Sequence, residues 1–205
     1  MNNQRNHIVI RVTALDARPS AAIAAIAAVS FNPETGEVSD RMFCRVDIES
    51  SQREGGTIDA SAVKWWLRQT AEARADFVSD DSVVLREALE KLNLFVLRQG
   101  AFGNCPVWFK NLDNDAPIIY SAMAAAGIAP AWQYARAHHV DTLIESIPPT
   151  IRHSRMVAWD YAACDLLSDA LNQVRLISSA WNVLAAMSAA YINSVPDHLA
   201  MLERS

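Results

Sequence analysis

The spacing of apolar residues in the first quarter of the chain predicts three strands. Residues 7–12 are almost continuously apolar, which is typical of a buried strand, and residues 41–47 alternate with strand period. The run at residues 21–31 is ambiguous, because its alanines favour a helix while its β-branched residues lead into a Pro- and Gly-containing turn at residues 32–36. We expect a strand there, which makes the opening an antiparallel meander.

After residue 59 the apolar period changes to that of helices. Asp59 is placed to cap a helix over residues 60–69, and residues 82–98 have an apolar stripe opposite a charged face. Further along, the pattern predicts a strand at residues 105–109, a helix at residues 115–126 ending at Gly127, and helices at residues 159–174 and 177–193. Strands followed by alternating helices and strands predict an α/β fold with a mixed sheet flanked by helices.

The length of 205 residues suits one domain with a short addition. We divide the chain into a domain at residues 1–176 and a helical extension at residues 177–205, packed either on that domain or on a partner. The helix over residues 177–192 is apolar nearly all round, but it contains Ser178 and Asn182. We therefore expect a helix outside the membrane rather than a membrane span.

The net charge bears on the class of partner, and the cysteine content bears on the cellular compartment. The net charge of −5 mildly disfavours nucleic acid as the main partner, because such binders usually carry a basic face. Three widely spaced cysteines without a Cys pair at metal spacing favour a reducing compartment. The polar first residues do not resemble a secretory leader, so we expect a cytoplasmic protein.

Four short segments resemble one known family. They are Arg-Pro-Ser-Ala-Ala-Ile at residues 18–23, Asn-Pro-Glu-Thr-Gly at residues 32–36, Gly-Gly-Thr-Ile-Asp-Ala at residues 55–60 and Val-Lys-Trp-Trp-Leu at residues 63–67. Their order and spacing are similar to those of the DEDDh 3′–5′ exonucleases, in particular the exonuclease VIII-like and RNase T-like branch of phages and bacteria. The resemblance implies an RNase H-like fold.

The same resemblance implies where metal ligands belong. The family places an Asp-x-Glu pair on its first strand, an Asp on a central helix and, on its last helix, an Asp preceded by a His that acts as general base. The matching positions in this chain are Arg11, Thr13, Asp115, Met156 and Tyr161. Only one carboxylate remains in this alignment, so the sequence predicts a pseudo-exonuclease with no metal, no cofactor and no catalytic residue.

A protein of this kind would act by binding. The resemblance suggests a phage or mobile-element origin and a host protein or nucleoprotein complex as partner, for example as an anti-CRISPR-type inhibitor. The apolar C-terminal helix is either part of the core or an interface for a partner or a second copy. The residues expected in such an interface are Trp181, Leu184, Met187 and Tyr191.

Two alternatives stay open. In the first, the protein binds nucleic-acid ends without cleavage, and Arg11 and Lys110 contact phosphates where metals would otherwise lie. In the second, the protein is an active metal-dependent 3′–5′ exonuclease. Trp65 and Trp66 fit either an aromatic edge of the core or a platform on which bases stack.

Overall fold

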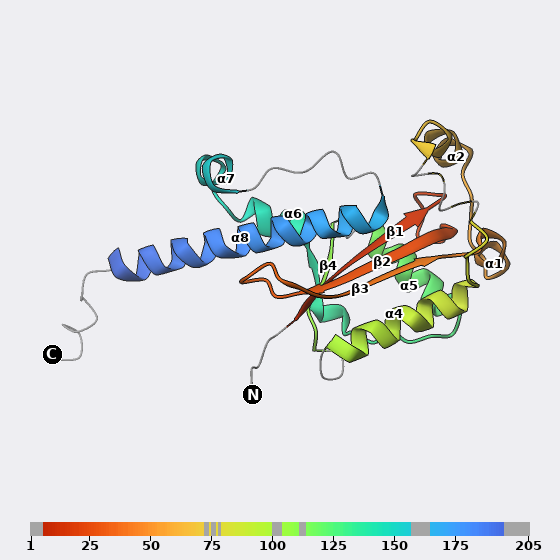
Figure 1. Cartoon of the computed structure of the whole chain (residues 1–205), viewed down its shortest axis with the longest axis horizontal. Coiled ribbons are helices and arrows are strands. Elements are labelled where there is room, and N and C mark those ends of the chain that lie inside the picture. The colour runs from red at the N-terminus through yellow and green to blue at the C-terminus, as the bar shows by residue number, and fades with distance from the viewer. Residues whose placement is uncertain are drawn as a thin grey trace.

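One mixed five-stranded sheet forms the centre of the molecule. The computed structural model describes residues 6–71, 74, 77, 79–99, 104–110, 114–156 and 165–194. The strand order is β3-β2-β1-β4-β5 (Figure 1). Strands β1 (His7–Ala14), β2 (Ile23–Phe31) and β3 (Val38–Arg45) are antiparallel, whereas β4 (Val107–Phe109) and β5 (Ala137–His139) run parallel to β1. The predicted meander and mixed sheet are confirmed.

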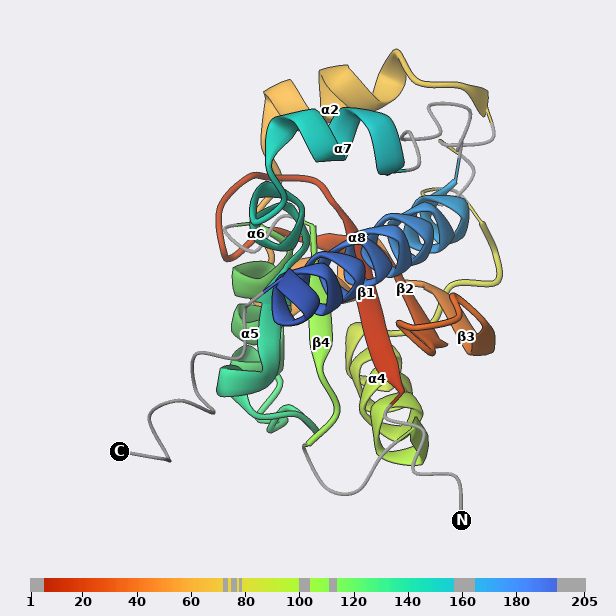
Figure 2. The same cartoon turned by 90° about the vertical axis from the view of Figure 1, so that its left-hand side faces the viewer.

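Helices cover both faces of this sheet. In chain order they are α1 (Ile48–Arg53), α2 (Ala60–Leu67), α4 (Leu85–Gln99), α5 (Asp115–Ala125), α6 (Val140–Glu145), α7 (Pro149–Arg155) and α8 (Leu166–Ser194). Helices α4 and α5 share one core cluster with Ile8 and Ile10 of β1. Helix α8 crosses the opposite face (Figure 2), and its buried residues share a core cluster with Val9. Alternate residues of β1 therefore belong to different layers.

The alanine-rich run at residues 21–31 contains strand β2, and every residue of that strand is buried. Ala28 belongs to the cluster under α4, whereas Ala25 and Ala27 belong to the cluster under α8. Small side chains on both faces let the two helical layers approach the backbone closely. The sequence of the strand is therefore a nearly continuous apolar run, as expected where helices cover both faces of a sheet.

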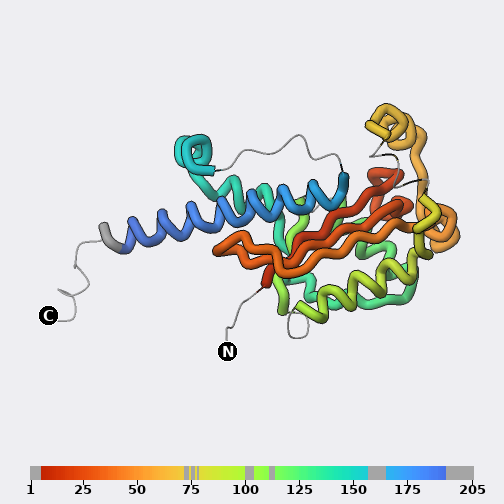
Figure 3. Tube along the Cα trace, viewed as in Figure 1, coloured from red at the N-terminus to blue at the C-terminus, as the bar shows by residue number. Residues whose placement is uncertain are grey.

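The end of the chain differs from the prediction. Instead of two helices at residues 159–174 and 177–193, the structure has the single helix α8, and residues 157–164 lie outside the described residues. Val174 and Ile177 are both buried residues of this helix, so the division at residues 176/177 falls inside it. The separation into a domain and an extension stays a prediction. The C-terminal end of α8 projects past the sheet (Figure 3).

Of the helices within the described residues, none combines the length and the apolar character that crossing a bilayer requires.

Candidate functional site

Arg11 lies on β1 between Val9 and Thr13, and its side chain joins two acids from distant parts of the chain. One guanidinium nitrogen, Nη1, donates to Oδ2 of Asp115. The Nε atom donates to Oδ2 of Asp169 at 2.6 Å. Two acids that lie 104 and 158 positions further along the sequence therefore meet at the Arg11 side chain on the central strand.

Local structure explains how the two acids arrive there. Asp115 is the first residue of α5, shortly after β4, which pairs with β1. Asp169 lies in the first turn of α8, whose start is fixed by Asp165: its Oδ1 accepts the Ser168 backbone N–H at 2.8 Å. Acids in the first turn of a helix are favoured by the helix dipole. Two helix N-terminal turns thus converge on Arg11.

The group is largely removed from solvent. Side-chain exposure is 14% for Arg11, 4% for Asp115 and 20% for Asp169. Burial works to lower the pKa of Arg11, but the two carboxylates outweigh it and raise that pKa. Burial raises the pKa of Asp115 to about 6, although Arg11 acts in the opposite direction. The site therefore holds one cation against two acids in a poorly hydrated setting.

Gln173 extends this group by one helical turn of α8. Its Nε2 atom lies 3.4 Å from Oδ2 of Asp169, and the side chain is fully buried. Its Oε1 atom has no hydrogen-bond partner among the described residues. A buried amide oxygen without a donor is unusual and costs free energy of about 1–3 kcal/mol.

The described residues do not fit a pair of divalent ions. In known enzymes two such ions lie about 3.5–4 Å apart, and several carboxylates hold them. Here the two carboxylates are already bound to one guanidinium. Within the described part of the chain, no group of three or more His, Cys, Asp or Glu side chains is arranged to hold a metal ion.

The structure brings some of the predicted site residues together and separates others. Thr13 is buried two residues along β1 from Arg11, and Lys110 is close enough to lower the pKa of Asp115 by its charge. Met156 packs instead against the apolar cluster around Ile147. Tyr161 lies outside the described residues.

Asp169 is the site residue that the sequence reasoning missed. The alignment placed the last carboxylate position at Tyr161, which is eight residues before Asp169. A signal was present, because Asp165 followed by Ser168 is a helix-start pattern that puts Asp169 in the first turn.

A second group of polar contacts lies at the end of β1. Asp16 accepts hydrogen bonds from Arg18 Nε at 2.6 Å and from Thr57 Oγ1 at 2.7 Å. The Arg18 contact, together with those of Thr57 and the backbone, lowers the pKa of Asp16 against the effect of burial. This network ties the segment before α2 to β1.

Helix α2 presents aromatic surface beside this end of β1. Trp66 donates its indole N–H to the carbonyl of Ala14 at 3.1 Å, whereas Trp65 is 54% exposed. The two rings meet edge to face, with centroids 4.6 Å apart. Trp66 is thus an anchor at the edge of the fold, and Trp65 is accessible to a ligand.

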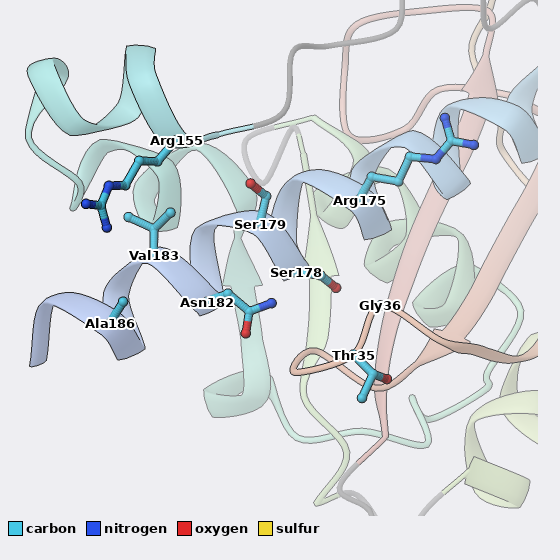
Figure 4. Close-up of a pocket in the computed structure, with 9 residues that line it drawn as sticks. All are labelled: Thr35, Gly36, Arg155, Arg175, Ser178, Ser179, Asn182, Val183 and Ala186. Carbon is cyan, nitrogen blue, oxygen red and sulfur yellow. The ribbon is translucent and has the colours of Figure 1, made fainter. Parts of the chain in front are cut away.

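A groove lies elsewhere, between the β2–β3 turn, α7 and α8, and has a volume of about 670 Å³ (Figure 4). Its lining residues are Thr35, Gly36, Arg155, Arg175, Ser178, Ser179, Asn182, Val183 and Ala186. None of the residues around Arg11 belongs to it. In Figure 4 the Arg155 and Arg175 side chains point in different directions, so they do not form a shared anion site.

The predicted partner-binding residues of α8 have different environments. Trp181 packs edge-on against His7, with ring centroids 5.2 Å apart, while Leu184 and Met187 pack against the cluster around Ile147. Tyr191 is 71% exposed. Most of this stripe is therefore packed within the chain, and its role in partner binding stays a prediction.

Comparison with known families identifies the domain. A family model described as the 3′–5′ exoribonuclease Rv2179c-like domain matches residues 6–181. The chain belongs to this family. The matched residues include β1, α5 and the first half of α8, which supply Arg11, Asp115 and Asp169. A search of curated proteins gave no significant match.

Solved structures show the same fold at low sequence identity. The nuclease domain of 3′hExo, a DEDDh family member bound to rAMP, has a TM-score of 0.60 and 12% identity, with 88% of this chain and 94% of that chain covered. Apo exonuclease I has a TM-score of 0.63 and 11% identity, with 98% and 47% covered. E. coli exonuclease I in complex with a 5cy-dA13 oligonucleotide has a TM-score of 0.61 and 12% identity, with 87% and 41% covered.

These matches confirm the RNase H-like, DEDDh exonuclease-like fold. This chain spans about half the length of the exonuclease I structures, since it covers 47% of the apo protein. The prediction of a pseudo-exonuclease that is not an enzyme is wrong, because the family that matches is one of 3′–5′ exoribonucleases. Asp169 adds to Arg11 and Asp115 a carboxylate that the sequence reasoning did not include.

Proposed function

We propose that this protein is a 3′–5′ exonuclease that acts on single-stranded nucleic acid, and that RNA is its main substrate. The family match over residues 6–181 is the observation that carries the proposal. The position of the site supports it: Asp115 and Asp169 come from two helix starts and meet at the central strand of the matched domain.

Helix α2 supports a path for the strand. Trp65 is exposed, and Trp66 fixes its helix to the end of β1, three residues beyond Arg11. Aromatic faces bind single-stranded bases with little sequence preference, at about 1–3 kcal/mol per stacked base. We propose that Trp65 stacks a base near the 3′ end, while the terminal phosphodiester lies towards Asp115 and Asp169.

A direct assay tests this function. The full chain is incubated with 5′-labelled single-stranded RNA and DNA, in Mg²⁺ or Mn²⁺ and with chelator, and the products are resolved by length. We expect stepwise shortening from the 3′ end. Asp115→Asn and Asp169→Asn should each slow it by at least about tenfold, since each removes a charged group from the reacting site.

Asp141→Asn, at an exposed acid on α6, is the matched control and should shorten RNA at the wild-type rate. Thermal unfolding of all three variants separates loss of activity from loss of fold. If the wild-type protein leaves both substrates intact under every condition, the proposed activity is refuted.

Further proposals concern the biological setting. A protein or nucleoprotein partner, or a second copy, is supported by the exposed Tyr191 and Ile192 at the end of α8. A phage or mobile-element origin, a role against host defence and a cytoplasmic location rest on the sequence alone. Co-purification followed by measurement of mass in solution tests the partner and the dimer.

A further inference from the structure

The cation at the centre of the candidate site belongs to the protein itself. Asp115 from α5 and Asp169 from α8 direct one carboxylate oxygen each to different nitrogens of Arg11. The three side chains are 4–20% exposed, so solvent contributes little to neutralising the two acids. Buried carboxylates require a compensating positive charge, and Arg11 supplies it here.

Removing the guanidinium would leave those acids without the positive charge that contacts both of them. Gln173 is fully buried one helical turn from Asp169: its Nε2 atom lies 3.4 Å from Oδ2 of Asp169, and its Oε1 atom has no hydrogen-bond partner among the described residues. Two carboxylates and an amide oxygen are all oxygen donors, which Mg²⁺ and Mn²⁺ prefer. With Arg11 in place, the two carboxylates face a delocalised cation.

We propose that Arg11 is a built-in cation that competes with divalent metal for Asp115 and Asp169, and that loss of its charge opens the site to one divalent ion. The inference concerns the site of the proposed function. Its test reads cation binding and not hydrolysis, so either proposal can fail without the other.

Manganese is the probe, because its binding is measured directly by electron paramagnetic resonance of the free ion. The full-length wild-type protein is compared with Arg11→Met, which keeps an apolar stem, and Arg11→Lys, which keeps a positive charge. We expect Arg11→Met to bind one Mn²⁺ at least about tenfold more tightly than wild type. Arg11→Lys should behave as wild type.

Thermal unfolding gives a second readout. Without metal, Arg11→Met should unfold at a lower temperature than wild type, because two acids lose their partner. Saturating Mn²⁺ should raise its midpoint by about 5 °C and raise that of wild type by less. The double variant Arg11→Met with Asp169→Asn should lose the gained binding.

Three outcomes overturn the inference. The first is equal Mn²⁺ affinity in wild type and Arg11→Met. The second is binding that survives Asp169→Asn, which would place the ion elsewhere. The third is failure of both Arg11→Met and Arg11→Gln to fold even in Mn²⁺, because a divalent ion then cannot take the place of the guanidinium.

Discussion

At the scale of single residues, the site is held together by ion pairs between Arg11 and two acids. The resemblance to the DEDDh exonucleases placed Arg11, Thr13 and Asp115 in one site. The helix-start pattern at Asp165 indicates that Asp169 lies in a first turn, but the sequence could not predict its contact with Arg11, because that contact joins residues 158 positions apart and depends on how α8 lies on the sheet. Spacing within one helix gives no information on that placement.

His7 offers a test at the same scale. It accepts a hydrogen bond from the Trp108 indole at 3.0 Å inside an aromatic cluster, and burial, assisted by the nearby His138, lowers its pKa to about 4. The unfolded chain takes up a proton below about pH 6.5, while the folded protein does not until about pH 4. The free energy of unfolding should therefore fall as the pH drops across this range.

We expect His7→Gln, which can still accept the Trp108 bond, to lose this dependence. The difference between wild type and variant should change by on the order of 3 kcal/mol from pH 7 to pH 4, measured by urea unfolding. Asp115 titrates in both proteins, so its contribution cancels. His153→Gln, at an exposed position on α7, is the control and should keep the wild-type pH dependence. Equal profiles for wild type and His7→Gln would contradict the assignment.

At the scale of elements, turns and caps were predicted well and short helices were not. Asp59 caps α2 through the Ser61 N–H, and Gly127 adopts a φ of 65° after α5, both as expected. Helices α1 and α7 were not predicted, since they have six and seven residues and too few turns to show a period. The single helix α8 appeared as two because its polar residues interrupt the apolar stripe.

Gly56 tests how tightly α1 is joined to the sheet. A Cβ there would lie 2.6 Å from the carbonyl oxygen of Ser51 and 2.9 Å from the Cα of Ala22, both of which are backbone atoms. We expect Gly56→Ala to lower the free energy of unfolding by about 3 kcal/mol, because neither atom can rotate away.

Gly127→Ala is the comparison, since its φ of +65° is strained for alanine but nothing lies within 4 Å of its Cβ. It should cost only about 1 kcal/mol. Urea unfolding measures both, and equal costs would show that the contact at Gly56 relaxes.

At the scale of the whole molecule, the fold class followed from the sequence while the outer boundary did not. The apolar pattern of the strands and the order of elements predicted the sheet, because a strand that is buried on both faces has a nearly continuous run of apolar residues. The sequence does not mark the end of the folded unit, because α8 continues from buried Ile177 and Val183 to exposed Tyr191 without a change of period.

Truncation locates that boundary. Deleting residues 189–205 removes exposed Tyr191 and Ile192 and should change the unfolding midpoint by less than about 2 °C. Deleting residues 177–205 removes Ile177, Ala180 and Val183 from the core and should abolish cooperative unfolding, because each large buried side chain contributes about 2–3 kcal/mol. Circular dichroism on heating measures both. A stable 1–176 fragment would instead support a separate extension.

The unbroken course of α8 has a mechanical consequence. A helix of 29 residues is a stiff rod of about 44 Å, with Asp169 near one end and Tyr191 near the other. The middle of α8 is packed on the sheet and on the cluster around Ile147. We expect a ligand bound near Tyr191 to act through this stiff helix on the contact between Asp169 and Arg11.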